Sequence, residues 1–327
     1  MQADYPYQSP LDCLQIEVTT HCNLRCPECS RTLHSANGTW ENLHMPVALF
    51  ESIVRKCPPA STLIVQGVGE PTLHPEFLEL LACAKGLGKF GAITFYTNGL
   101  ARPVQYYLDL LESGLSGFVI SVDSFDPDIA KSCRAGTDVA RLRTLLAAVS
   151  RRTRPNVSIV LSMKNLADLP ATLLELNALG PVTVSIQPLA NYRPEVDDNT
   201  PNQYALNEEA MQVYEAMKSG FKELYPNLDV CDAGLAYARK NGEASRFGAG
   251  KVYCRRPFTY PFITSAGYLS PCCLVHEPDV LGRASLAGRS FDEVWASRSV
   301  QDWLHELVTA TPAVCADCIL NPNPTGR

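Results

Sequence analysis

Cys22-Asn-Leu-Arg-Cys26-Pro-Glu-Cys29 is the stretch that decides the fold of this 327-residue chain. It brings three thiols together directly after residues 13–19, an apolar and β-branched run that predicts a buried strand. Thiolates are soft ligands suited to zinc, Cu(I) or iron–sulfur clusters. Four cysteines saturate an iron–sulfur cluster, whereas three leave one iron open to an exogenous chelating ligand. The motif therefore predicts a metal centre at the end of the first strand.

The composition agrees with metal binding. The chain holds 13 cysteines and shows no export signal at its start, and disulfides are rare in reducing compartments. Lys plus Arg total 28 against 34 Asp plus Glu, and this charge of −6 argues against nucleic acid or a membrane as partner. No run reaches the roughly 18 apolar residues of a membrane span. We expect a cytoplasmic protein with metal-bound cysteines, a zinc knuckle completed by His21 or His34 being the alternative to iron and sulfide.

Short β-rich runs alternate with helical patterns through the first half of the chain. Strands are expected at residues 13–19, 62–66, 91–96, 117–122, 156–163 and 182–187. Helices are expected at about 46–56, 75–87, 102–113, 138–153 and 168–178. Most strand candidates are continuously apolar, as parallel strands covered on both faces are. The pattern predicts an α/β fold, a partial (β/α)6 TIM-like barrel.

The remainder of the chain has a different character. Loops are expected at residues 190–205 and 240–256, and helices at about 207–224 and 290–308. The segment FITSAGYLSPC (262–272) predicts a β-hairpin that turns at Ala266-Gly267. We expect a barrel domain at 1–190, bridging loops and a helix at 191–250, and a small β-hairpin/helix iron–sulfur domain at 251–327. A unit this small needs a metal or cross-links for stability.

Polar groups follow successive predicted strands. They are Gly69 and Glu70 within Gly67-Val-Gly-Glu-Pro71, then Asn98, then Ser121 and Asp123, with Arg134 shortly after. The carboxyl ends of barrel strands present ligand-binding groups at one rim. A carboxylate such as Glu70 suits an ammonium group, and Ser121 and Asp123 suit ribose hydroxyls.

With these motifs the chain resembles the radical S-adenosylmethionine (SAM) superfamily over about residues 10–190. The resemblance implies that Cys22, Cys26 and Cys29 hold a [4Fe–4S] cluster whose fourth iron is chelated by SAM. It further implies that Glu70 holds the SAM amino group, with Gly69 and Asn98 in the same site. Ser121 and Asp123 then lie near the ribose, and Arg134 near the carboxylate. Glu28 departs from the family, which usually places an aromatic residue there, near the adenine.

The C-terminal cysteines resemble those of a truncated SPASM, or twitch, domain. Cys254, Cys272, Cys315 and Cys318 are separated by 18, 43 and three positions. The resemblance implies that they saturate one auxiliary [4Fe–4S] cluster, with a zinc ribbon as the alternative. Cys272 directly follows Pro271, as the family's ligand does, so the resemblance favours Cys272 as the ligand and leaves Cys273 beside the cluster or in packing.

The resemblance also implies the chemistry. A reductase, flavodoxin or ferredoxin supplies an electron, SAM is cleaved to a 5′-deoxyadenosyl radical, and the radical abstracts a substrate hydrogen. An auxiliary cluster beside the substrate suits dehydrogenation, whereas a thiol that returns hydrogen suits epimerisation, with Cys231 and Cys273 as candidates.

The substrate class is a separate expectation. A first strand beginning by residue 13 leaves no space for a leader-binding domain, which favours a polar small molecule such as a sugar or aminocyclitol. In layout the chain is most similar to the aminocyclitol dehydrogenase of aminoglycoside biosynthesis. A peptide-modifying maturase and a non-catalytic iron–sulfur or zinc sensor are the alternatives.

Overall fold

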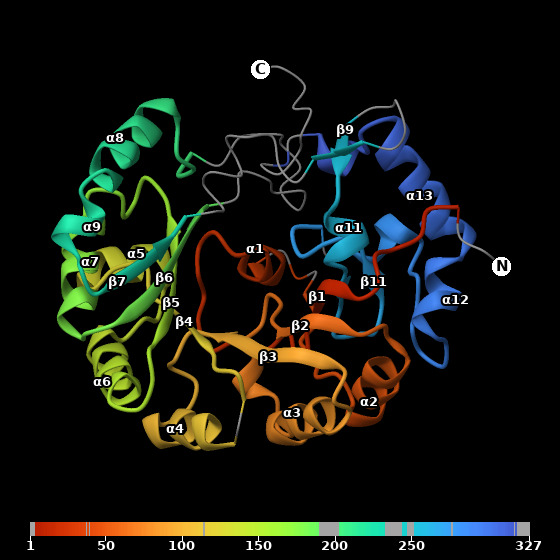
Figure 1. Cartoon of the computed structure of the whole chain (residues 1–327), viewed down its shortest axis with the longest axis horizontal. Coiled ribbons are helices and arrows are strands. Elements are labelled where there is room, and N and C mark those ends of the chain that lie inside the picture. The colour runs from red at the N-terminus through yellow and green to blue at the C-terminus, as the bar shows by residue number, and fades with distance from the viewer. Residues whose placement is uncertain are drawn as a thin grey trace. The chain divides into compact units, whose positions relative to one another are not determined.

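The computed structural model describes residues 4–36, 38, 40–113, 115–189, 203–232, 244–246, 252–275, 277–316 and 318 (Figure 1). The chain divides into two compact units, each assembled from separate stretches. The first comprises Met1–His21, Glu41–Phe95 and Tyr237–Arg327, and the second Cys22–Trp40 and Tyr96–Ala236.

The first unit contains a mainly parallel sheet in the order β11-β10-β1-β2-β3. Its strands are β1 (Leu11–Ile16), β2 (Ala60–Val65), β3 (Phe90–Thr97, the last two residues of which belong to the second unit), β10 (Phe262–Ile263) and β11 (Leu269–Ser270). The crossovers carry the helices α2 (Val47–Lys56) and α3 (Phe77–Gly86). Leu11, Leu14 and Ile16 of β1 are fully buried, as expected for a parallel strand covered on both faces.

The C-terminal part of the first unit is built on the expected hairpin. Strand β10 runs parallel to β1, and β11 returns antiparallel to it. Gly267 takes a φ of +80° at the turn, where its N–H donates to the Thr264 carbonyl at 2.8 Å. The other elements here are β8 (Ala244–Arg246), β9 (Val252–Cys254), α11 (Arg256–Thr259), η2 (Pro278–Leu281), α12 (Phe291–Trp295), α13 (Arg298–Thr309) and η3 (Ala313–Cys315).

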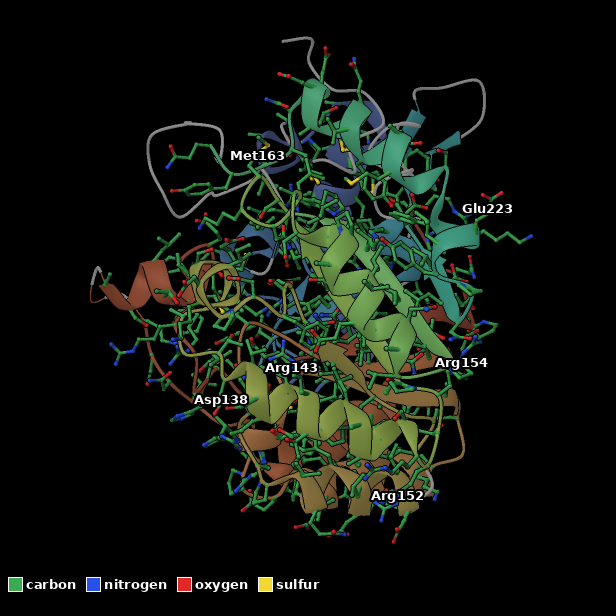
Figure 2. All side chains as sticks on the ribbon, turned by 90° about the vertical axis from the view of Figure 1, so that its left-hand side faces the viewer. Asp138, Arg143, Arg152, Arg154, Met163 and Glu223 are labelled. Carbon is green, nitrogen blue, oxygen red and sulfur yellow. The ribbon has the colours of Figure 1, made fainter. Side chains whose placement is uncertain are left out.

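The second unit continues with parallel strands in the order β4-β5-β6-β7, and Tyr96 and Thr97 of β3 pair with β4. The strands are β4 (Val119–Ser121), β5 (Asn156–Leu161), β6 (Val182–Pro188) and β7 (Leu228–Cys231). Its helices are α1 (Ser30–Ala36), α4 (Val104–Glu112), α5 (Pro127–Cys133), α6 (Val139–Ser150), α7 (Leu169–Ala178), α8 (Glu208–Lys218) and α9 (Phe221–Leu224). Figure 2 looks onto this unit, with Asp138 at the start of α6 and Arg152 beyond its end.

All six expected strands and the five expected crossover helices are present, with ends shifted by a few residues. The helix expected at 207–224 is interrupted at Ser219-Gly220, and the one expected at 290–308 at Ala296-Ser297. A Ser290–Glu293 capping box starts α12. Most of the loop expected at 190–205 lies outside the described residues. None of the helices in the described ranges has the length and apolar character needed to cross a membrane.

Candidate functional site

The cysteine loop of the second unit directs backbone N–H groups at its sulfur atoms. The Leu24 N–H lies 3.4 Å from Cys22 Sγ, and the N–H groups of Arg31 and Thr32 donate to the Cys29 thiol. The Cys29 N–H closes a turn on the Cys26 carbonyl at 3.1 Å. Hydrogen bonds to sulfur are among the features with which proteins tune iron–sulfur clusters, so this donor set fits one.

Burial controls the protonation of these thiols. It raises the pKa of Cys26 to about 11, a rise that the neighbouring Arg134 guanidinium limits, and it also raises the pKa of Cys29. Iron and zinc bind the thiolate, so loading of the site releases protons.

The end of β3 contacts the cysteine loop through Asn98. Its Nδ2 donates to Asn23 Oδ1 at 2.9 Å and lies 4.0 Å from Cys22 Sγ. Its Oδ1 accepts the Leu100 N–H at 2.8 Å, which fixes the orientation of the amide. Asn98 therefore holds the first half of the loop.

The segment after α5 holds the loop from its other side. The Arg25 N–H donates to the Ala135 carbonyl at 3.1 Å, and Leu24 lies against Gly136. Gly136 has a φ of +98°, and a Cβ there would approach the Leu24 side chain to 3.1 Å. This close approach explains the glycine.

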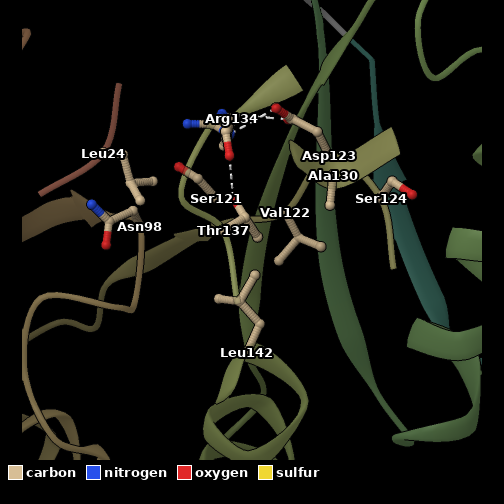
Figure 3. A pocket seen from close by; sticks show the side chains of 10 residues that line it. All are labelled: Leu24, Asn98, Ser121, Val122, Asp123, Ser124, Ala130, Arg134, Thr137 and Leu142. Atoms are coloured by element: carbon tan, nitrogen blue, oxygen red, sulfur yellow. Dashed lines mark hydrogen bonds and ion pairs between the residues drawn. The ribbon is translucent and has the colours of Figure 1, made fainter. Parts of the chain in front are cut away.

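Four of the residues predicted to bind SAM line one pocket in the second unit (Figure 3). They are Asn98, Ser121, Asp123 and Arg134. Leu24 of the cysteine loop lines it too. The strand ends thus bring their polar groups together beside the loop that carries the thiols.

Asp123 and Arg134 form a two-point ion pair in this pocket. Arg134 donates from Nε at 2.7 Å and from Nη2 at 3.4 Å, and Asp123 Oδ1 also accepts the Val160 N–H at 2.9 Å. Burial alone lowers the pKa of Arg134, but the Asp123 carboxylate, together with nearby Cys26 and Cys133, outweighs burial, so the pKa is raised. Their assignments to the ribose and the SAM carboxylate stay predictions.

Gly69 and Glu70 lie in the first unit, next to the backbone that leads into the thiols. The Glu70 N–H donates to the carbonyl of His21, the residue before Cys22, at 2.8 Å. A Cβ on Gly69 would lie 2.1 Å from the Thr19 carbonyl oxygen. Glu70 is buried, and its carboxylate accepts a hydrogen bond from the Thr72 hydroxyl at 2.6 Å, at the start of η1 (Pro71–Leu73).

The C-terminal cysteines gather in the first unit. Cys272 is buried, and burial together with nearby Cys273, Cys318 and Cys254 raises its pKa. Burial, with Cys318 and Cys254, also raises the pKa of Cys315 to about 12. Neutral thiols are favoured where several thiolates would repel, and a metal removes that repulsion. These influences place the four thiols in one neighbourhood, and their binding of one cluster stays a prediction.

Cys273 has a different environment. Its Sγ accepts a hydrogen bond from Arg256 Nη1 at 3.5 Å, and the Arg256 guanidinium lies 4.7 Å from the Tyr260 ring centroid. Tyr260 in turn hydrogen-bonds Cys13, and burial raises the pKa of Cys13 to about 12. Sequence reasoning missed these companions because they come from distant segments.

Cys231, the other thiol considered as a hydrogen donor, ends β7 of the second unit. It is exposed, pairs in register with Ser185 of β6, and is not among the residues that line the pocket. All 13 cysteines, each within the described residues, are free thiols in the structure.

Comparisons with known proteins agree with this geometry. Residues 16–176 match the model of the radical SAM superfamily, and residues 254–319 match SPASM, an iron–sulfur cluster-binding domain. A GTP 3',8-cyclase of Petrotoga mobilis is 28% identical over 167 residues, half of each chain. A 7,8-dihydro-6-hydroxymethylpterin dimethyltransferase of Methanocaldococcus jannaschii is 30% identical over 110 residues, 33% of this chain and 21% of that one. The matched segment thus spans half or less of these relatives.

Solved structures share the fold. SuiB of Streptococcus suis bound to S-adenosylmethionine superposes with a TM-score of 0.68 and 19% identity, covering 97% of this chain and 73% of SuiB. The enzyme anSMEcpe with bound AdoMet gives a TM-score of 0.66 and 17% identity, covering 90% and 82%. These similarities confirm the expected α/β partial-barrel fold, and the matched domains make SAM and two iron–sulfur clusters the cofactors. The chain therefore combines a segment that matches the radical SAM superfamily with a segment that matches the SPASM iron–sulfur cluster-binding domain.

Proposed function

We propose that this enzyme oxidises a polar small molecule, such as a sugar or an aminocyclitol, at an unactivated C–H bond. When bound at Cys22, Cys26 and Cys29, a reduced [4Fe–4S] cluster and SAM supply a 5′-deoxyadenosyl radical that abstracts a hydrogen atom. An auxiliary cluster supplies an acceptor for the second electron, so that loss of a proton leaves a carbonyl product. The protein's part is to bind, orient and exclude water.

The pocket of the second unit supports the assignment of SAM-binding residues. Ser121 presents a hydroxyl there, and Asp123 presents a carboxylate that Arg134 and the Val160 N–H hold in place. A carboxylate held in this way is preorganised to accept hydrogen bonds from a diol. We assign Glu70 of the first unit to the SAM amino group, because its carboxylate is the acidic group of the glycine-rich turn.

One observation carries the choice of oxidation over epimerisation: Cys273 is hydrogen-bonded to Arg256 beside a group of four other thiols. Cys254, Cys272, Cys315 and Cys318 influence one another electrostatically, and Cys273, which also raises the pKa of Cys272, accepts a hydrogen bond from Arg256. A complete set of four thiolates suits a saturated cluster that only transfers electrons. A Cys273 sulfur that accepts a hydrogen bond from the Arg256 guanidinium is held in place and is less free to reach a substrate radical.

Epimerisation is the second candidate, and exposed Cys231 favours it. A thiol at the surface of β7 is accessible to a bound molecule and to the reductants that would restore it. A peptide substrate is a third candidate: SuiB has been solved with its precursor peptide SuiA, and anSMEcpe with a Cp18Cys peptide. We rank the peptide below the small molecule because these similarities concern the fold.

The test is anaerobic incubation of the reconstituted enzyme with SAM, dithionite and a panel of sugars, aminocyclitols and peptides. We expect 5′-deoxyadenosine to form with the wild type and not with Cys26→Ala. A sugar or aminocyclitol should increase its formation and give a carbonyl product two hydrogens lighter. Exchange of dithionite for reduced flavodoxin or ferredoxin tests the electron donor.

Solvent deuterium separates the candidates. Oxidation gives a product without solvent deuterium at the abstracted position, and Cys231→Ala leaves the rate unchanged. Epimerisation gives a product of unchanged composition with one deuterium, and the same variant stops it. A response to the peptides alone would replace the small-molecule proposal.

A further inference from the structure

An ion pair inside the second unit links the cysteine loop to a turn far along the chain. Lys164 Nζ lies 2.9 Å from Glu28 Oε1, and the side chains are 14% and 10% exposed. The two residues are 136 positions apart in sequence, so tertiary structure alone brings them together. Glu28 stands at the position where the resemblance led us to expect an aromatic residue.

The Lys164 ammonium group joins more than two segments. It also donates to the Ser132 carbonyl at 3.2 Å, in the last turn of α5. Two residues further, Arg134 follows that helix as its C-cap and pairs with Asp123. Lys164 thus connects the loop that carries the thiols with the helix that Arg134 caps.

Lys164 is itself held in place. Its Nζ lies 3.9 Å from the centroid of the Tyr204 ring, and the N–H of Met163, labelled in Figure 2, donates to the Tyr204 carbonyl at 2.9 Å. A cation over an aromatic face is attracted to it, more strongly where water is excluded. Because these partners fix the ammonium group, it can fix Glu28.

The charge on Glu28 gives the pair a second consequence. Glu28 lies between Cys26 and Cys29, which bind iron as thiolates, so its carboxylate adds a negative charge beside an anionic centre. Nearby charge is one of the factors that set the reduction potential of an iron–sulfur cluster. The Lys164 ammonium group offsets the charge of Glu28.

We propose that Lys164 is a positioning residue that acts through Glu28: it fixes the cysteine loop against α5 and neutralises the carboxylate beside the SAM-binding cluster. It acts on the assembly of the SAM site and on the potential of its cluster, and touches neither substrate nor the reacting atoms. The proposal rests on the assigned SAM site and is independent of which substrate is oxidised.

The experiment compares Lys164→Met with the wild type, both as anaerobically reconstituted holoenzyme without substrate. One readout is the SAM dissociation constant, followed by the change that SAM causes in the electron paramagnetic resonance spectrum of the reduced cluster. The other is the midpoint potential of the cluster that responds to SAM. We expect SAM to bind about tenfold more weakly, in the range found for supporting residues of metal sites, and the potential to become more negative.

Two further variants identify the route of the effect. Glu28→Gln removes a negative charge and leaves Lys164 bonded to Ser132, so it should shift the potential in the positive direction. Glu28→Met/Lys164→Met replaces the pair by apolar side chains, which is commonly neutral for a buried ion pair, and should restore both readouts to near the wild-type values. Lys131→Met, an exposed lysine of α5, is the matched control and should change neither.

Several results would overturn the proposal. One is wild-type SAM binding and potential in Lys164→Met; another is a double variant as impaired as the single one. If Lys164→Met does not fold, the potential of Glu28→Gln decides, and a value unchanged or more negative refutes the electrostatic role. Because neither readout includes substrate, failure of the oxidation assay leaves this test unaffected.

Discussion

Arg134 and Asp123 meet through two hydrogen bonds, with Nε 2.7 Å from Oδ2 and Nη2 3.4 Å from Oδ1. The Val160 N–H of β5 donates to the same carboxylate. The polar group at the end of β4 is therefore fixed from two sides before any ligand arrives. Such preorganisation lowers the cost of ordering the site on binding.

Arg134→Met should destabilise the protein and weaken SAM binding. Asp123 is 7% exposed, so removal of its partner leaves a largely buried carboxylate. Breaking a buried pair costs about 3–5 kcal/mol. Because the Arg134 side chain is 21% exposed, we expect the free energy of unfolding to fall by about 2 kcal/mol. Urea unfolding measures the change. Arg134→Lys should recover only part of it, because lysine lacks the planar fork, whereas a loss below about 0.5 kcal/mol for Arg134→Met would contradict a stabilising pair.

Cys272→Ser and Cys273→Ser should differ in iron content. Cys272 is buried near Cys254 and Cys318, so its replacement should remove the auxiliary cluster. Cys273 is bonded to Arg256, so its replacement should leave both clusters in place. Iron and sulfide per chain, measured after anaerobic reconstitution, distinguish the variants. Loss of iron from Cys273→Ser but not from Cys272→Ser would show that Cys273, and not Cys272, is the cluster ligand.

Local patterns predicted the barrel elements because burial acts on neighbouring residues. The apolar run at 156–163 contains β5, and the helical pattern at 46–56 contains α2. The missed helix α5 begins at Pro127 after Asp126, whose side chain accepts the N–H groups of Asp128 and Ile129. That Asp-Pro start was a readable signal. Helix α1 buries no residue, so its sequence had no hydrophobic pattern from which the helix could be predicted.

Contacts between distant segments could not be predicted in this way. Strand β10 pairs with β1 across more than 240 residues, and Glu28 meets Lys164 across 136. The strand-end rule did predict that Asn98, Ser121 and Asp123 would share a pocket. The same rule could not predict that Asp123 and Arg134 form an ion pair with each other, because each group could equally well bind an oppositely charged or polar group of a ligand.

Gly69→Ala should impair folding, whereas Gly86→Ala should not. A Cβ at Gly69 would lie 2.1 Å from the Thr19 carbonyl oxygen and 2.8 Å from that of His21, and backbone atoms cannot move aside cheaply. Nothing lies within 4 Å of a Cβ at Gly86, the last residue of α3. The melting temperatures of the two variants measure the contrast. Gly69→Ala should also retain less iron, since its turn is bonded to the residue before Cys22. Equal melting temperatures would contradict this account.

Cys57→Ala should flatten the fall in stability at alkaline pH. Burial raises the pKa of Cys57 from 9.0 to about 12, and Lys89 limits that rise. Between these values the unfolded thiol has lost its proton while the folded thiol keeps it, so the unfolded state binds fewer protons. The free energy of unfolding then decreases by about 1.4 kcal/mol per pH unit for this one group. The contribution of Cys57 to the free energy of unfolding is complete below pH 9 and is lost as the pH rises toward 12.

Urea unfolding of both proteins at pH 8 and pH 10.5 should show that Cys57→Ala is less stable than the wild type at pH 8. The difference in the free energy of unfolding between the two proteins should narrow at pH 10.5. Parallel changes in the two proteins would show that Cys57 is not responsible for the loss.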